Sequence, residues 1–320
     1  MTRLLVTGAA GFIGSHACEA LLAAGHDVVG VDNFDPFYGR ELKERNLETC
    51  RRDARFRLLE FDMAREDLPL AGIDVVVHLA GRPGVRPSLE DPVGYVAANV
   101  TATVRALEAA RRAGVVRFVF GSSSSVYGES TPAPFPEAAR ADEPISPYAA
   151  SKRAAELFTR AFSHLYGTRI AALRFFTVYG PRQRPDLAIR RFFERIRAGQ
   201  PIAMHGDGSS ERDYTYISDI VDGIVAAIEW TARPNAGPWA AFNLGGGAKV
   251  RLDRLIALIG AAAGRDPVIE RRPDQPGDVP LTSADLTVAG RELGFRPKVG
   301  IEEGIRRFAR WYEETYGRQS

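Results

Sequence analysis

Tyr148 and Lys152 stand four positions apart in the stretch Tyr-Ala-Ala-Ser-Lys. A free tyrosine loses its proton only near pH ~10, so it is a weak base at neutral pH. On a helix, a lysine one turn further on lies on the same face and stabilises the phenolate. The pair therefore predicts an acid–base group that takes a proton from an alcohol while a hydride leaves the same carbon.

A glycine-rich segment near the amino end predicts where the hydride acceptor binds. Gly8, Gly11 and Gly14 follow an expected buried strand at 3–7 and open an expected helix at 12–24. Tight strand–helix turns also use glycine. In this context, however, backbone N–H groups and the helix N-terminus can bind a pyrophosphate.

Acidic residues after the next two expected strands refine the cofactor prediction. Asp32 can accept hydrogen bonds from both adenosine ribose hydroxyls, and its charge would repel a 2′-phosphate, which favours NAD over NADP. Asp62 suits either the adenine edge or a helix cap. The positive charge of a bound nicotinamide would also stabilise a phenolate at Tyr148.

Composition is that of an ordinary globular protein. Of the 320 residues, 45% are hydrophobic and 26% are charged, and the net charge of +2 gives no reason to expect nucleic acid or an anionic membrane as partner. The two cysteines and five histidines lack metal-ligand spacing, so we expect no metal and a reducing cytoplasm. We see no cleavable signal pattern, and no apolar run approaches the ~20 residues that span a bilayer.

Hydrophobic periodicity predicts the elements that position these groups. Short apolar strands alternate with amphipathic helices in the first half, which predicts a parallel sheet with helices on both faces. Strands are expected at 3–7, 28–31, 56–61, 75–79, 116–121 and 170–175, and helices at 12–24, 92–113 and 147–166. Beyond about 176, glycine and proline interrupt the pattern, and helices are expected at roughly 187–198, 218–231, 252–263 and 301–316.

These elements predict an α/β fold with a Rossmann-type doubly wound parallel sheet and a smaller carboxyl-terminal α/β lobe. We assign 1–176 to the cofactor-binding domain, to which a later segment at about 214–243 returns. We assign 177–320 mainly to a discontinuous substrate-binding lobe. Ligands are expected in the crevice between the two, at the carboxyl ends of the strands.

The glycine spacing, the Tyr148–Lys152 pair and the serines before Val126-Tyr127-Gly128 together resemble the extended short-chain dehydrogenase/reductase family. The resemblance spans essentially the whole chain. It implies that Ser123 completes the catalytic group and holds the substrate hydroxyl opposite Tyr148, although a serine run also suits a solvated turn. The cofactor contacts expected for NAD are Gly8, Gly11, Phe12, Ile13, Gly14, Asp32, Asn33, Asp62, Leu79, Ala80, Gly81, Asn99, Tyr148 and Lys152.

Within that family, the chain is most similar to nucleotide-sugar 4-epimerases, and in particular to UDP-glucuronate 4-epimerases. The similar stretches are 32–38, 84–88, 174–181, 184–186, 206–208, 212–215 and 275–279, the last of which contains Asp278, an expected substrate contact. The resemblance implies that Arg212 contacts the diphosphate, for which a guanidinium fork is suited, and that 187–205 surrounds the uridine. A surface ion pair is the alternative for Arg212.

Two departures from related enzymes refine the substrate. Thr177 stands where many 4-epimerases of neutral sugars carry Asn, and Ser125 stands where decarboxylases and 4,6-dehydratases generally carry Glu. The hydroxyls of Ser124, Ser125 and Thr177 can hydrogen-bond a sugar carboxylate. Arg184 or Arg86 can supply positive charge there, or either can serve the diphosphate instead.

The resemblance implies an isomerase that interconverts the two C4 configurations of a UDP-sugar, with UDP-glucuronate and UDP-galacturonate as the favoured pair. Hydride passes to tightly held NAD, and the transient 4-keto sugar turns over before hydride returns to its opposite face. Alternatives are a UDP-glucose or UDP-N-acetylglucosamine 4-epimerase, a UDP-glucuronate decarboxylase, which Ser125 disfavours, and a catalytically silent dinucleotide sensor. Such enzymes usually pair through two helices of each subunit, here 92–113 and 147–166, which implies a homodimer with a four-helix bundle.

Overall fold

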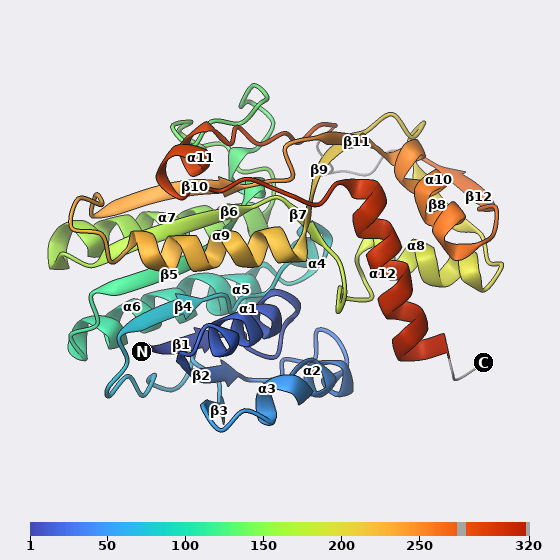
Figure 1. Cartoon of the computed structure of the whole chain (residues 1–320). Helices are drawn as coiled ribbons and strands as arrows, with labels where there is room; N and C mark the ends of the chain where they lie inside the picture. The colour runs from blue at the N-terminus through green and yellow to red at the C-terminus, as the bar shows by residue number, and fades with distance from the viewer. Residues whose placement is uncertain (274–279, 318–320) are drawn as a thin grey trace.

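The computed structural model describes residues 1–273 and 280–317. Its largest unit is a sheet of seven strands in the order β10-β6-β5-β4-β1-β2-β3 (Figure 1). All neighbouring strands pair in parallel. The strands are β1 (Arg3–Thr7), β2 (Asp27–Asp32), β3 (Phe56–Glu60), β4 (Val75–His78), β5 (Arg117–Ser123), β6 (Arg169–Phe175) and β10 (Trp239–Leu244). This order contains the doubly wound arrangement of dinucleotide-binding folds, and the predicted fold class is therefore confirmed.

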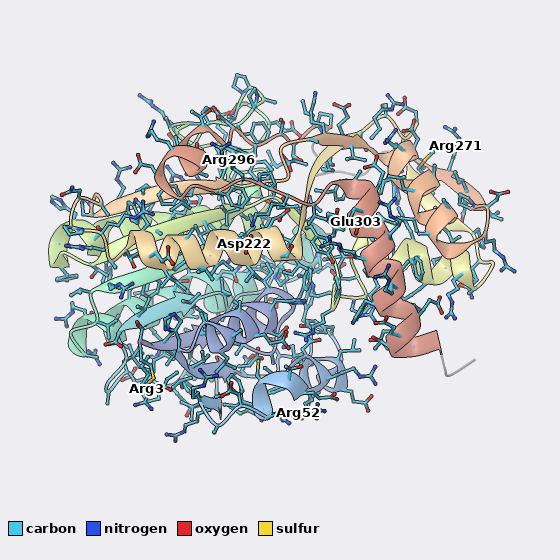
Figure 2. The ribbon with its side chains drawn as sticks, viewed as in Figure 1. Arg3, Arg52, Asp222, Arg271, Arg296 and Glu303 are labelled. Atoms are coloured by element: carbon cyan, nitrogen blue, oxygen red, sulfur yellow. The ribbon has the colours of Figure 1, made fainter. Side chains whose placement is uncertain are left out.

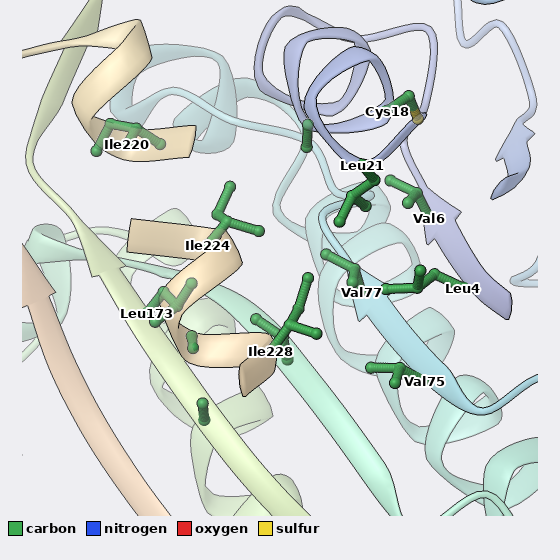
Figure 3. Packing of buried hydrophobic residues seen from close by; sticks show 14 of the residues in the cluster. Leu4, Val6, Cys18, Leu21, Val75, Val77, Leu173, Ile220, Ile224 and Ile228 are labelled. Atoms are coloured by element: carbon green, nitrogen blue, oxygen red, sulfur yellow. The ribbon is translucent and has the colours of Figure 1, made fainter. Parts of the chain in front are cut away.

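Helices cover both faces of the sheet because its strands are apolar on both sides. On one face, α1 (Phe12–Ala23) and α9 (Ile217–Trp230) pack over side chains such as Leu4 and Leu173 (Figure 3). On the other face, α6 (Ala102–Arg112) and α7 (Pro147–Tyr166) pack over side chains such as Leu5. Successive residues of β1 thus enter opposite cores, as the strand period of two requires.

Shorter helices follow the strands at the end where the sequence predicts ligands. They are α2 (Arg40–Asn46), α3 (Glu48–Arg51), α4 (Val85–Glu90) and α5 (Pro92–Tyr95). The single helix predicted over 92–113 is wrong in detail, because a π-helical segment, Val96–Thr101, separates α5 from α6. Widened turns of this kind are frequent at functional sites, and this one carries Asn99.

A second, smaller unit contains two short sheets. Strands β7 (Thr177–Tyr179), β9 (Glu211–Tyr216) and β11 (Lys249–Arg251) form one, and β8 (Ile202–His205) and β12 (Ile269–Arg272) form the other. With α8 (Ala188–Arg197), α10 (Leu252–Ala263) and α12 (Ile301–Tyr316), they enclose a core that includes Phe193, Leu255 and Phe308 (Figure 1). The remaining helix, α11 (Thr287–Glu292), packs against β10.

Many charged side chains lie on the outside of both units. Figure 2 shows Arg3 and Arg52 on the large unit and Arg271 on the small one, and all three are exposed. Within residues 1–273 and 280–317, no helix is both long and apolar enough to cross a membrane.

Candidate active site

A cavity of about 640 Å³ opens at the carboxyl ends of the central strands. Its wall includes residues that end or directly follow β1, β2, β4 and β5. The predicted cofactor contacts all lie in this wall, with the exception of Asn99. The structure therefore gathers, in one place, residues that are up to 144 positions apart in the sequence, from Gly8 to Lys152.

The glycine loop between β1 and α1 forms a cradle that side chains would fill. Gly8 has a φ of +69°, and a Cβ there would lie 2.9 Å from the backbone nitrogen of Ala80. A Cβ at Gly14 would collide with the carbonyl oxygen of Gly8. Because Gly11, the residue before α1, provides no side-chain cap, the first N–H groups of the helix are available to an anion. The loop therefore fits the pyrophosphate of a dinucleotide.

The adenosine end of the cavity is marked by two carboxylates. Asp32 is almost completely buried at the end of β2, whereas Asp62 is partly exposed and accepts a hydrogen bond from the backbone of Ala64 at 2.9 Å. Asp62 therefore supports a local turn and also borders the cavity.

Asn99 is buried behind the cavity wall. Its Oδ1 accepts a hydrogen bond from the backbone N–H of Arg82 at 2.7 Å, and its Nδ2 donates to the Ser151 hydroxyl at 2.9 Å. The amide thus joins the loop after β4 to α7. These contacts give Asn99 a positioning function, and its predicted contact with the cofactor stays a prediction.

The start of α7 fixes the positions of Tyr148 and Lys152. Ser146 caps the helix, since its hydroxyl accepts a hydrogen bond from the N–H of Ala149 at 3.1 Å, and Pro147 occupies the first turn. Tyr148 follows in the first turn and Lys152 one turn later, so both side chains reach the cavity.

Lys152 is buried, with 7% of its surface exposed. Its Nζ donates a hydrogen bond to the carbonyl oxygen of Gly121 at 2.8 Å, which ties the ammonium to β5. Burial lowers the pKa of Lys152 to about 8, although the negative charge of Glu156 raises it. Glu156 is itself fully buried on α7 and forms an ion pair with Arg174 at 2.9 Å.

Tyr148 is harder to ionise in the protein than in water. Burial raises its pKa, whereas the hydrogen bond with Ser123 and the positive charge of Arg184 lower it. The hydroxyl of Ser123 also lies 3.1 Å from that of Ser125 in the turn after β5. A phenolate at this position therefore requires further positive charge, which Lys152 and a bound nicotinamide are suited to supply.

Arg184 is the one predicted substrate contact, among the described residues, that borders this cavity. Its guanidinium forms an ion pair with Asp186 at 2.8 Å and lies 5.5 Å from the centre of the Phe37 ring. Arg184 thus brings a cation of the small unit against the segment that follows β2.

The other predicted substrate contacts that the structure describes lie outside the cavity wall. Ser124 and Ser125 form the turn after β5, while Thr177 and Arg212 belong to the paired strands β7 and β9. Arg86 is exposed on α4. Asp278 falls outside the described residues.

Lys43 is a site residue that the sequence did not reveal. It projects from α2 into the cavity wall, has 6% of its surface exposed, and places its Nζ 3.4 Å from Oδ1 of Asp32. Only four of the 42 lysine and arginine residues in the sequence are lysines, and this scarcity was the feature that could have drawn attention to Lys43.

The family follows from comparison with known proteins. Residues 4–245 match the model of the NAD dependent epimerase/dehydratase family. The chain belongs to this family. Its cofactor is accordingly NAD, which the cradle described above fits.

Comparison with individual relatives shows which members of the epimerase/dehydratase family this chain resembles. It is 40% identical to a probable UDP-glucuronate 4-epimerase of Rhizobium meliloti, with 99% of this chain and 98% of that protein aligned. It is 39% identical to a UDP-glucuronate 4-epimerase of Thermodesulfobacterium geofontis, over 98% and 97% of the two chains. A UDP-glucuronic acid 4-epimerase from Bacillus cereus, solved with UDP-glucuronic acid and NAD, superposes with a TM-score of 0.93 at 35% identity, covering 98% of this chain and 100% of that one. The predicted resemblance to nucleotide-sugar 4-epimerases is thus confirmed.

Proposed function

We propose that this chain is an NAD-dependent isomerase that interconverts UDP-glucuronate and UDP-galacturonate at C4 of the sugar. One observation carries the proposal. The Tyr148–Lys152 pair and the glycine loop border a single cavity, in a chain that aligns along nearly its full length with UDP-glucuronate 4-epimerases.

The chain's own residues account for the proton steps. Tyr148 takes the proton of the C4 hydroxyl and later returns it, while Ser123, its hydrogen-bond partner, holds that hydroxyl. Lys152 stabilises the phenolate, and its bond to the Gly121 carbonyl fixes the ammonium in place. When bound, NAD supplies the hydride acceptor and donor. Because the hydride removed from C4 is returned to C4, the reaction is redox-neutral and needs no second substrate.

A glucuronate substrate requires protection of its carboxylate. The 4-keto form of that sugar is a β-keto acid, which loses carbon dioxide unless the carboxylate is held in an unfavourable orientation. We assign this restraint to the hydroxyls of Ser124, Ser125 and Thr177, with Arg184 as the nearby cation. The 3.1 Å distance between the Ser123 and Ser125 hydroxyls supports the assignment, because it links this turn to the catalytic group.

Incubation with a panel of UDP-sugars, without added NAD, tests the proposed activity. We expect UDP-glucuronate to give UDP-galacturonate, with product resolved by anion-exchange chromatography. Epimerisation of UDP-glucose or UDP-N-acetylglucosamine in its place would replace the proposed substrate, and release of carbon dioxide with a UDP-pentose would identify a decarboxylase. Dinucleotide binding without any turnover would refute the proposed enzymatic activity and favour a catalytically silent dinucleotide sensor.

We also assign the two ligands to the two units of the fold. Cofactor binding is assigned to 1–176 with the returning segment at about 214–243, and nucleotide-sugar binding mainly to 177–320, where Arg212 contacts the diphosphate. The position of β10 at the edge of the large sheet, with α9 packed over the same sheet, supports the returning segment.

A second copy of the chain is the proposed partner. α7 packs beside α4, α5 and the π-helical segment. These elements expose Leu89, Val93, Val96, Leu157, Phe158 and Leu165. An apolar surface of this kind supports the predicted homodimer, in which helices of two subunits form a bundle.

We further propose that the enzyme acts in the reducing cytoplasm. The two cysteines, Cys18 and Cys50, are both buried free thiols, which supports that location.

A further inference from the structure

Helix α2 buries polar side chains where most helices bury apolar ones. Its buried residues are Lys43 and Asn46, whereas the Arg40 side chain is 51% exposed. Asn46 donates a hydrogen bond to the carbonyl oxygen of Ala10 at 3.0 Å, so the helix is fastened to the glycine loop. A buried ammonium is costly unless an anion compensates it, and for Lys43 the compensating anion is Asp32.

Three donors converge on the Asp32 carboxylate. The backbone N–H of Ala10 donates to Oδ2 at 3.0 Å, the backbone N–H of Phe34 donates to Oδ1 at 2.8 Å, and the Lys43 ammonium lies 3.4 Å from Oδ1. Phe34 has a φ of +51°, in the left-handed region that large side chains rarely adopt. Two backbone amides and a cation around one point form an anion site, which the chain fills with its own carboxylate.

This anion site lies where the adenosine ribose of the cofactor is expected to bind. In doubly wound folds, the acid at the end of the second strand receives the adenosine 2′-hydroxyl, and an anion next to that hydroxyl is what distinguishes NADP from NAD. Asp32 and Lys43 both border the cavity at this end of β2. Because Lys43 compensates Asp32, the pair presents little net charge, and repulsion by Asp32 does not by itself explain the choice of NAD.

We propose that Lys43, with the N–H groups of Ala10 and Phe34, forms a latent 2′-phosphate site, from which the Asp32 carboxylate excludes NADP by occupying it. Lys43 is then a determinant of cofactor choice together with Asp32. The inference concerns dinucleotide binding alone, so it stands or falls separately from the identity of the sugar substrate.

Four proteins test the proposal: the wild type, Asp32→Ser, Asp32→Asn and the double variant Asp32→Ser/Lys43→Met. Serine empties most of the anion site, asparagine removes the charge but keeps the site filled, and methionine keeps the volume of Lys43 without its charge. Each protein is exchanged against an equimolar mixture of NAD and NADP and passed through gel filtration. The bound dinucleotides are then released by acid and quantified by chromatography, and circular dichroism checks that each variant folds.

We expect the bound NADP-to-NAD ratio to rise at least ~10-fold in Asp32→Ser, as charge-assisted hydrogen bonds to the freed site predict. Asp32→Asn should gain much less, and the double variant should return close to the wild-type ratio. If the NADP-to-NAD ratio rose as much in Asp32→Asn as in Asp32→Ser, simple charge repulsion by Asp32 would explain the exclusion of NADP, and the proposed occupied phosphate site would be refuted. A gain that persists in the double variant would show that another cation, such as the exposed Arg65 in the same wall, binds the phosphate. Should Asp32→Ser fail to fold, the same comparison is made with Asp32→Ala.

Discussion

At the scale of single residues, the proposed mechanism requires cations that compensate the burial of Tyr148. Burial raises the pKa of this tyrosine beyond what the Ser123 hydrogen bond and the charge of Arg184 offset. The phenolate is therefore stabilised only when positive charge is placed beside it, and the 2.8 Å bond that anchors Lys152 to Gly121 is a fixed part of that arrangement.

Replacing Tyr148 with phenylalanine removes the proposed proton acceptor and keeps the ring. We expect kcat for UDP-glucuronate to fall about 10²- to 10⁴-fold, the usual contribution of a positioned acid–base group. Bound NAD should remain, because the glycine loop is unchanged. Tyr166→Phe, an exposed tyrosine on the same helix, is the matched control and should keep wild-type kcat. Undiminished turnover by Tyr148→Phe would refute the mechanism.

In the proposed mechanism Lys152 must stay protonated to stabilise the phenolate, so we expect this ammonium to set the alkaline limit of activity. Its pKa is lowered by burial to about 8 and raised by Glu156, so activity should fall as the pH rises through the pKa of this ammonium. Glu156→Gln removes the charge that raises the pKa, and the alkaline limb of kcat/KM should therefore move to lower pH. Glu108→Gln, on the exposed face of α6, should leave the limb in place. A limb that does not move in Glu156→Gln would contradict the assignment to Lys152.

At the scale of elements, α7 is held to the sheet by a polar anchor inside an apolar interface. Glu156 accepts hydrogen bonds from the Ser122 hydroxyl at 2.6 Å and from Arg174 at 3.0 and 2.9 Å, which connects α7 to both β5 and β6. Ser122 and Ser123 are neighbours at the end of β5, and both hydroxyls bond to residues of α7. Ser122 anchors the helix through Glu156, and Ser123 contacts Tyr148, the proposed acid–base group.

Removing one partner of the Glu156–Arg174 ion pair should destabilise the protein more than replacing both partners with apolar side chains. Glu156→Leu leaves the Arg174 guanidinium buried without its partner, and we expect a loss of about 3–5 kcal/mol in the free energy of unfolding. The double variant Glu156→Leu/Arg174→Met should recover most of that loss, since an apolar pair of similar volume needs no compensation. Urea denaturation of the three proteins measures both quantities. Equal losses in the single and double variants would show that the ion pair itself provides the stability.

The sequence predicted the strands of the large sheet and the helices of the small unit well, since 252–263 and 301–316 coincide with α10 and α12, but it did not reveal the short strands of the small unit. The strands of the sheet are buried on both faces, so they read as continuous apolar runs, and the predicted 3–7 coincides with β1. Strands β7 and β11 are three residues long and carry no such run. The helix predicted over 92–113 was interrupted by a π-helical segment whose determinant is tertiary, because Asn99 bonds to residues outside that helix.

In the candidate site, too, features encoded by local spacing were predicted, whereas features set by tertiary contacts were not. The gathering of the glycines, Tyr148 and Lys152 around one cavity was predictable, because their spacing along the chain is itself the chemical signal. Lys43 was not, because α2 is a short polar segment whose burial depends on its contact with the glycine loop. The predicted assignments of Ser124, Ser125, Thr177 and Arg212 depend on the shape of a bound sugar nucleotide, which spacing alone does not encode.

At the scale of the whole molecule, the exposed apolar residues on and beside α7 form the proposed dimer interface, and a substitution among them tests it. Val93 is 79% exposed and Leu157 is 52% exposed, on neighbouring helical elements. Val93→Asp places a charge in the proposed interface, and we expect light scattering to show a dimer for the wild type and a monomer for the variant at the same concentration. Val268→Asp, at a 59% exposed position in the small unit, is the control and should remain dimeric. A wild-type monomer, or a dimeric Val93→Asp, would refute this interface.

The place of β10 in the large sheet has a consequence for biosynthesis. β10 pairs with β6 although more than sixty residues separate them in the chain, and α9, which covers the same sheet, also comes late. While the ribosome is still translating the segment between them, the nascent sheet has an unpaired edge and an uncovered apolar face. We therefore expect folding of this part to be completed only after residue 244 has left the exit tunnel, and the growing chain to expose apolar surface to chaperones until then.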